Sequence, residues 1–256
     1  IRASMQVAVS TEITVQEIRR ASERIRPIAY RTPVMTSRTF NAEAGTNVFF
    51  KCENFQRGGS FKIRGARNFL ASLPSDTLAR GVVAYSSGNH AQAVAIAAEA
   101  AGVPATLIMP SDAPRSKVEA TRARGANILT YDRFREDREA IGRRVAEETG
   151  AELVPPFDHP WIIAGAGTAA LELLEEQPDL NAIVVCIGGG GLISGSAIAA
   201  KAHNPGIRIF GVEPADANDT YLSLRTGDRV EIPAPATIAD GLRSPKPGAV
   251  TFPIVQ

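Results

Sequence analysis

Short hydrophobic runs alternate with longer segments of helical periodicity along almost the whole chain. The short runs predict strands over Asn47–Cys52, Val82–Tyr85, Thr106–Met109, Asn127–Tyr131, Ile183–Ile187 and Arg208–Val212. The longer segments predict helices over Val15–Ile25, Lys62–Leu73, Asn89–Ala101, Arg115–Arg124, Asp137–Glu148, Ala164–Glu176, Gly191–His203 and Ala217–Arg225. This alternation predicts an α/β fold in which helices cover largely parallel sheets.

The composition is that of a globular protein with an ordinary hydrophobic core. With 256 residues, of which 44% are hydrophobic, the chain suits one large domain or two smaller ones. A net charge of +1 provides no long-range field for nucleic acid or an anionic membrane, so we expect neither as a partner. The uncharged stretch from Ala182 to Ala200 contains five glycines, which favours a strand, a turn and a buried helix over a membrane span.

Cysteine usage indicates a reducing compartment. The chain has two cysteines, Cys52 and Cys186, which are too few for a disulfide framework, and both lie in strands that we predict to be buried. No signal peptide is visible in the sequence. We therefore predict a cytoplasmic protein.

Lys62 is chemically unusual in this chain. It is one of five lysines among 28 basic residues, and it lies between the apolar side chains of Phe61 and Ile63. A partly desolvated lysine has a lowered pKa and can attack a carbonyl, which a guanidinium cannot do. The residues alone leave a second interpretation open, in which the stem packs on its neighbours and the ammonium reaches water.

A loop of small polar residues, Ser86-Ser87-Gly88-Asn89-His90, joins a predicted strand to a predicted helix. Hydroxyl groups and free backbone amides at a helix start suit a carboxylate or a phosphate. The same residues are also typical of ordinary N-capping. Taken alone, His90 is better explained as a packed or hydrogen-bonded histidine than as a catalyst.

A second loop consists of four consecutive glycines, Gly188 to Gly191, between a predicted strand and a predicted helix. Without Cβ atoms, successive backbone amides can converge on an anion. No Gly-Lys-Ser/Thr sequence follows, which disfavours a Walker phosphate loop. The loop therefore indicates an anion site of another kind.

A third loop follows the last predicted strand and carries Glu213 and Asp219, six residues apart. Two carboxylates around a turn with free carbonyls between them could hold a hard cation such as Mg²⁺ or Ca²⁺. The spacing alone favours the alternative, an acidic helix N-terminus that the helix dipole stabilises.

These loops and Lys62 together match one kind of ligand. An aldehyde-bearing, phosphorylated cofactor needs an amine for its carbonyl, backbone amides for its phosphate and a polar loop for a substrate carboxylate. Pyridoxal phosphate meets this description.

Three blocks of sequence carry a family resemblance: residues 53–66, 86–92 and 188–192. They resemble the fold type II pyridoxal-phosphate enzymes, which have the tryptophan synthase β-like fold, and within them the serine/threonine dehydratase and serine racemase family. The resemblance covers residues 10–256. It implies two three-layer α/β domains: a large domain from residues 5–80 and 159–256, and a small domain from residues 81–158, with the cofactor between them.

The resemblance also implies roles for individual residues. Lys62 would form the covalent link with the cofactor aldehyde and later move the substrate α-proton, with Phe61 against the pyridine ring. Asn89 would hydrogen-bond the phenolic oxygen of the cofactor. The phosphate would be bound by the backbone amides of Gly188, Gly189, Gly190, Gly191 and Leu192.

For the substrate and a cation, the resemblance implies two further groups. The substrate carboxylate would be framed by Ser86, Ser87, Asn89 and His90, and Ser87 matches the acid/base on the face opposite Lys62. Glu213, the carbonyl of Ala217 and Asp219 match a divalent-cation site for Mg²⁺ or Ca²⁺.

The implied reaction is deamination of L-threonine or L-serine to the 2-oxo acid and ammonia, by a homodimer. Serine racemisation and dehydration of 3-hydroxyaspartate are the nearest alternatives. Relatives continue beyond Gln256 with a block whose serine partners the pyridine nitrogen, so we expect part of the large domain to be missing. This stretch alone would then bind the cofactor weakly, and a noncatalytic ligand-binding module is the alternative from another class.

Overall fold

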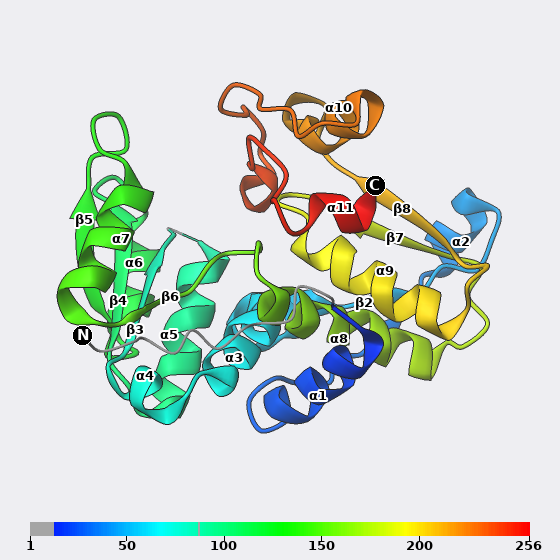
Figure 1. Ribbon diagram of the computed structural model, residues 1–256. Coiled ribbons are helices and arrows are strands. Elements are labelled where there is room, and N and C mark those ends of the chain that lie inside the picture. Colours follow the sequence, from blue (N-terminus) through cyan, green and yellow to red (C-terminus); the bar gives the residue numbers. More distant parts are fainter. Residues whose placement is uncertain (1–12, 87) are drawn as a thin grey trace.

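The computed structural model describes residues 13–86 and 88–256 and has two regions of parallel sheet joined by packed helices (Figure 1). The first helix, α1 (Val15–Ile25), begins where the Thr14 hydroxyl accepts a hydrogen bond from the Glu17 amide. Its buried face, which carries Ile18 and Ala21, packs on helices that lie much later in the chain.

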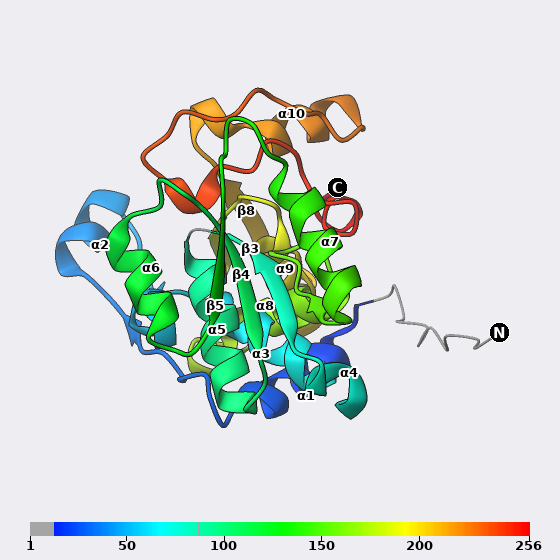
Figure 2. The same ribbon diagram turned by 90° about the vertical axis from the view of Figure 1, so that its left-hand side faces the viewer.

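A four-stranded parallel sheet forms one side of the molecule, in the order β5-β4-β3-β6. Its strands are β3 (Val82–Tyr85), β4 (Ala105–Pro110), β5 (Asn127–Tyr131) and β6 (Glu152–Leu153). One face packs on α5 (Asn89–Ala101) and α6 (Arg115–Arg122), and the other packs on α7 (Arg138–Thr149). Figure 2 shows these three layers with the strands side by side.

The second parallel sheet pairs β7 (Ala182–Cys186) with β8 (Arg208–Val212). Its buried face packs on α8 (Pro160–Glu176) and α9 (Gly191–His203). In the described part of the chain, the other face is open, and Val184 is 66% exposed.

Helices α3 (Lys62–Ser72), α8 and α9 pack so closely that side chains would not fit between them. A Cβ atom at Gly165 would lie 2.4 Å from the carbonyl oxygen of Arg64, and one at Gly195 would lie 2.4 Å from that of Ile163. These glycines therefore allow the three helices to pack closely, and this packing fixes the position of α3, whose first residue is Lys62.

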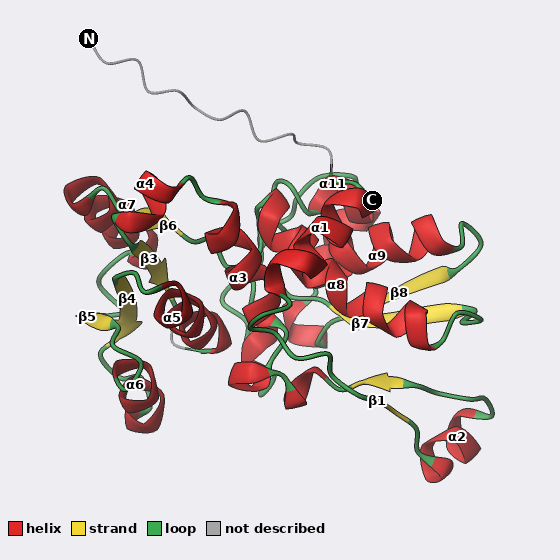
Figure 3. Cartoon of the chain, turned by 90° about the horizontal axis from the view of Figure 1, so that it is seen from below, coloured by secondary structure: helices red, strands yellow, loops and turns green. Residues whose placement is uncertain are grey.

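A short antiparallel pair lies at one edge of the molecule, away from the four-stranded sheet (Figure 3). It joins β1 (Val34–Met35) to β2 (Phe50–Lys51), with α2 (Arg38–Ala44) between them in sequence. The remaining short elements are α4 (Ser75–Ala79), α10 (Asp219–Thr226), α11 (Phe252–Val255) and the 3₁₀ turns Glu53–Phe55, Arg57–Gly59, Ala215–Ala217 and Asp240–Leu242.

The predicted α/β class with largely parallel sheets is confirmed. The predicted strand Asn47–Cys52 shortens to two residues, and α8 begins four residues before the predicted Ala164. That earlier start has a local cause, because the His159 ring caps the helix and Pro160 occupies its first position. No helix in the described residues is long and apolar enough to span a bilayer.

The expected burial of both cysteines was wrong. Cys186 is exposed, because it is the last residue of β7 and its side chain lies on the open face of that strand. Cys52 lies just beyond β2 and is only partly buried. Burial of the cysteines therefore no longer supports the prediction of a reducing compartment.

Candidate active site

Lys62 is the first residue of α3 and lines a cavity. Its Nζ donates a hydrogen bond of 2.7 Å to the carbonyl oxygen of Pro156 and lies 5.3 Å from the centre of the Phe61 ring. Burial lowers the pKa of Lys62 to about 8, although the nearby Cys186 acts in the opposite direction. A lysine with this pKa is partly neutral near neutral pH and can act as a nucleophile.

The chain before Lys62 is held by side-chain hydrogen bonds. The buried Gln56 side chain accepts from the amides of Tyr30 and Arg57 and donates to the Tyr30 carbonyl. Gly58 has a φ of +75°, and a Cβ there would lie 2.9 Å from Ile96. This turn delivers Phe61 and Lys62 to the cavity.

The glycine loop, Gly188–Gly191, forms the opposite part of the cavity wall. Within the described residues, the amides of Gly188, Gly189 and Gly190 donate no hydrogen bond, and the loop leads directly into the N-terminus of α9. Free amides at the positive end of a helix form an anion site. The full lining is Phe61, Lys62, Pro156, Phe157, Ile162, Ala166, Cys186, Gly188, Gly189, Gly190, Gly191, Leu192, Gly241 and Leu242.

These features fit pyridoxal phosphate. The free amides of the glycine loop suit its phosphate, and the amine of Lys62 suits its aldehyde, in one and the same cavity. The loop also has no room for side chains, because a Cβ at Gly189 would lie 2.4 Å from the Phe157 ring. The residues that the sequence assigned to the cofactor therefore meet here, with the exception of Asn89.

Ser86 and Asn89 belong to the loop of small polar residues at 86–90, and neither of them lines this cavity. Asn89 is exposed as the first residue of α5, and the Ser86 hydroxyl accepts from the Gly88 amide at 3.2 Å. Ser87, which the sequence proposes as an acid/base, lies outside the described residues. The roles of all three stay predictions.

His90 is buried beside the site, and its Nε2 lies 3.0 Å from the carbonyl oxygen of Val154. Burial and, secondly, the charge of Lys62 lower the pKa of His90 to about 3, so the ring is neutral at neutral pH. Because a carbonyl only accepts, Nε2 carries the proton and Nδ1 has a lone pair. The neutral ring thus has no second donor for a substrate carboxylate.

Glu213 and Asp219 lie close together at the start of α10. One carboxylate oxygen of each is buried without a hydrogen-bond partner in the described structure. Burial, followed by the charge of Glu213, raises the pKa of Asp219 to about 7, and burial also raises the pKa of Glu213. No group of three or more His, Cys, Asp or Glu in the described residues could hold a metal ion, so further ligands would be backbone oxygens or water.

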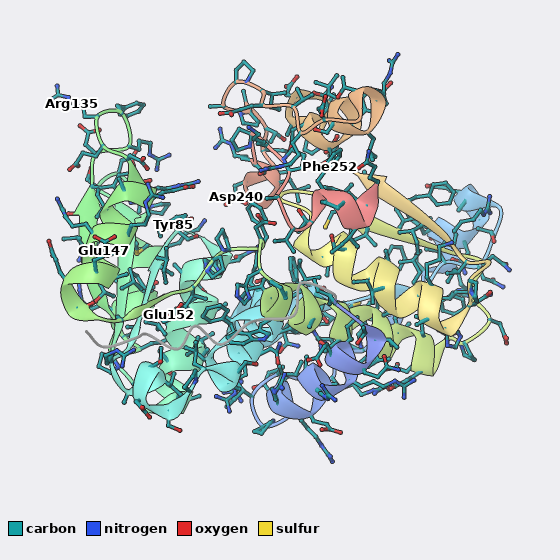
Figure 4. The ribbon with its side chains drawn as sticks, in the orientation of Figure 1. Tyr85, Arg135, Glu147, Glu152, Asp240 and Phe252 are labelled. Atoms are coloured by element: carbon teal, nitrogen blue, oxygen red, sulfur yellow. The ribbon has the colours of Figure 1, made fainter. Side chains whose placement is uncertain are left out.

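Several cavity residues were not expected from the sequence. Pro156 contributes a backbone carbonyl, Phe157 covers the glycine loop, and Gly241 and Leu242 complete the wall. Figure 4 shows Asp240, the neighbour of Gly241, between the side of the molecule with Tyr85 and the side with Phe252. Backbone groups and packing residues of this kind leave no chemical pattern in a sequence.

Comparison with known proteins identifies the family. The profile "Pyridoxal-phosphate dependent enzyme" matches residues 25–256. An L-threo-3-hydroxyaspartate ammonia-lyase from Saccharomyces cerevisiae is 51% identical, over 95% of this chain and 74% of that protein. A serine racemase from Schizosaccharomyces pombe is 49% identical over 95% of this chain and 75% of that protein.

The fold agrees with this match. The structure of maize serine racemase superposes with a TM-score of 0.92 at 48% identity, covering 94% of this chain and 73% of the maize chain. The profile match, the relatives and the shared fold agree with the cavity that joins Lys62 to the glycine loop. The chain belongs to the fold type II pyridoxal-phosphate dependent enzymes.

Proposed function

We propose that the protein is an ammonia-lyase that eliminates water from a small β-hydroxy amino acid and releases a 2-oxo acid and ammonia. L-Threonine and L-serine are the substrates expected from the sequence. 3-Hydroxyaspartate is a second candidate, favoured by the similarity to the yeast ammonia-lyase. The observation that carries the proposal is the amine of Lys62, with its lowered pKa, in the cavity of the glycine loop.

When bound, pyridoxal phosphate supplies a conjugated ring that stabilises negative charge at the substrate α-carbon. The protein supplies the base. With a pKa of about 8, roughly one tenth of Lys62 is neutral at pH 7, and that neutral amine can accept the α-proton. When the amine of Lys62 is free, its hydrogen bond to the Pro156 carbonyl holds Nζ in the cavity.

The neighbouring groups assist by position. The glycine loop, with Leu192, offers amides to the phosphate, and Phe61 offers an apolar face to the ring. Ser86, Ser87 and the backbone of Asn89 and His90 at the start of α5 are proposed to receive the substrate carboxylate.

We also propose the domain division given by the resemblance: a large domain from residues 5–80 and 159–256, and a small domain from residues 81–158. The four-stranded sheet, whose strands lie between Val82 and Leu153, supports it. A homodimer and a cytoplasmic location stay predictions from the sequence.

Product analysis tests the proposed reaction. Purified protein with pyridoxal phosphate is incubated with L-serine, D-serine, L-threonine or 3-hydroxyaspartate, and ammonia, 2-oxo acid and enantiomers are measured. We expect ammonia and oxo acid in equal amounts from at least one substrate. Interconversion of serine enantiomers without ammonia would instead identify a racemase, and no turnover of any substrate would favour a ligand-binding module.

A divalent-cation site at Glu213, Asp219 and the carbonyl of Ala217 is part of the proposal. We expect millimolar Mg²⁺ or Ca²⁺ to raise the melting temperature, and Asp219→Asn to remove the effect. Because the pKa of Asp219 is raised to about 7, its carboxyl is protonated below that pH, so the stabilisation should be larger at pH 8 than at pH 6. An equal melting-temperature shift in the Asp219→Asn variant would contradict this site.

A further inference from the structure

Three consecutive residues connect separate parts of the cofactor cavity. The Pro156 carbonyl accepts from Lys62, and the Phe157 ring lies against Gly189. The carboxylate of Asp158 binds the segment from Ala249 to Thr251. Asp158 has no part in the chemistry proposed above, which raises the question of what it holds in place.

Asp158 accepts three backbone hydrogen bonds from one short segment. Its Oδ2 accepts from the Ala249 amide at 2.7 Å, and its Oδ1 accepts from the amides of Val250 and Thr251 at 2.8 and 3.1 Å. The segment fits tightly, because a Cβ at Gly248 would lie 2.1 Å from Oδ1. Charge-assisted bonds to three successive amides fix the position of Thr251.

Thr251 is fully buried, and its hydroxyl and carbonyl bind the glycine loop and helix α9. Its hydroxyl donates a 2.7 Å hydrogen bond to the Gly189 carbonyl. Its own carbonyl accepts from the Ser194 hydroxyl, in the first turn of α9. Glycine has no side chain that could hold its backbone. The Gly189 carbonyl also accepts a longer hydrogen bond, of 3.4 Å, from the Gly248 amide, so the Thr251 hydroxyl provides the shorter of the two bonds that hold this peptide.

The geometry of a trans peptide transmits that contact. In a planar trans peptide the C=O and the following N–H point in opposite directions, and the described chain has no cis peptide. When the Gly189 carbonyl points to Thr251, the Gly190 N–H points away from it. Gly190 lines the cavity, and its N–H donates to no group in the described structure.

We propose that Asp158 and Thr251 are positioning residues, which hold the Gly189–Gly190 peptide so that its N–H faces the cofactor phosphate. Asp158 accepts from the Thr251 amide, and the Thr251 hydroxyl donates to the Gly189 carbonyl. The Gly190 amide then donates to the phosphate. This inference rests on the phosphate position proposed for the glycine loop. Neither residue touches the reacting atoms.

The test compares pyridoxal phosphate with pyridoxal, which lacks the phosphate. Dissociation constants for both are measured by absorbance titration for the wild type, Thr251→Val, Thr251→Ser and Asp158→Asn. Val removes the hydroxyl at nearly constant volume, and Ser retains it as the matched control. We expect Thr251→Val to weaken pyridoxal phosphate binding about tenfold, Thr251→Ser less than about threefold, and neither to change pyridoxal binding more than about twofold.

Each result has a distinct meaning. Equal weakening of both ligands by Thr251→Val, or no weakening of either, would overturn the proposal. If Thr251→Val does not fold, Asp158→Asn decides. Its side-chain NH₂ cannot accept from the Ala249 amide, and its neutral oxygen weakens the bonds to Val250 and Thr251, so it must weaken pyridoxal phosphate selectively while the Thr251 hydroxyl stays in place. Failure of the underlying phosphate site is recognised separately, since the wild type would then bind pyridoxal and pyridoxal phosphate equally well.

Discussion

Replacing Lys62 with alanine is expected to abolish the covalent link to pyridoxal phosphate and to reduce turnover by about 10³-fold or more. The reason is that, in the proposed mechanism, one amine both attacks the cofactor aldehyde and accepts the substrate α-proton. After borohydride reduction, intact mass and peptide mapping should locate the modification on the Lys62 peptide of the wild type. The Lys62→Ala protein should show no added mass and no yellow absorbance.

Two controls separate chemistry from charge. Lys62→Arg keeps a positive side chain but provides no nucleophilic amine, so it should fail like alanine. Lys246→Ala removes a lysine that is partly exposed and that pairs with Glu231 alone among the described residues, so it should leave labelling intact. Undiminished labelling in Lys62→Ala would show that another residue carries the cofactor.

The lowered pKa of Lys62 adds a pH dependence to the same experiment. Below pH 8 the amine is increasingly protonated and cannot attack, so the rate of covalent attachment should rise with pH and level off above about 8. An exposed lysine would continue to gain reactivity up to about pH 10.4. A rate that still rises tenfold between pH 8.5 and pH 10 would contradict the buried environment of Nζ.

The fold was largely predictable because hydrophobic periodicity records burial within each element. The helices Val15–Ile25, Asn89–Ala101 and Gly191–His203 begin and end where the sequence predicts. Elements that depend on distant partners were missed: β1 exists only because it pairs with β2, and β6 adds two residues to the edge of a sheet. Two-residue strands contain too few positions for any periodicity.

The candidate site was predictable where the residue type itself carries the chemistry. An amine at Lys62 and the Cβ-free loop after β7 are visible in the sequence, and the structure brings them to one cavity. The Pro156 carbonyl and the Asp158–Thr251 contact were not predictable, since a backbone acceptor has no residue signature and the second contact joins residues far apart in sequence. Only the folded chain brings them together.

Behind the site, a buried ion network anchors α3. Arg64, two residues after Lys62, is fully buried and donates hydrogen bonds to the carboxylates of Glu53 and Glu172. Lys51 lies 2.8 Å from Glu172 and shares that carboxylate. Burial alone would raise the pKa of Glu172, but the hydrogen bonds from Arg64 and Lys51 outweigh it and lower the pKa.

Replacing Arg64 with methionine is expected to reduce the free energy of unfolding by about 3–5 kcal/mol, because it leaves buried carboxylates without their cation. Arg31→Met is the matched control, since Arg31 also binds two glutamates but its side chain is 51% exposed, and about 0–1 kcal/mol should be lost. Urea unfolding at pH 7 measures both. A loss below about 1 kcal/mol in Arg64→Met would show that the network does not stabilise the fold.

The sign of the pH dependence follows from Glu172. A carboxyl whose pKa is lowered in the folded state stabilises the fold above its unfolded value near 4.5, and that contribution disappears as the pH falls through the folded pKa. The difference in the free energy of unfolding between the wild type and Arg64→Met should therefore become smaller below about pH 4.5.

A double variant tests whether unpaired charge causes the loss. Adding Glu53→Gln to Arg64→Met removes the carboxylate that no lysine shares, so the double variant should recover part of the lost stability. If it is less stable than Arg64→Met alone, the unpaired charge of Glu53 is not the cause of the loss.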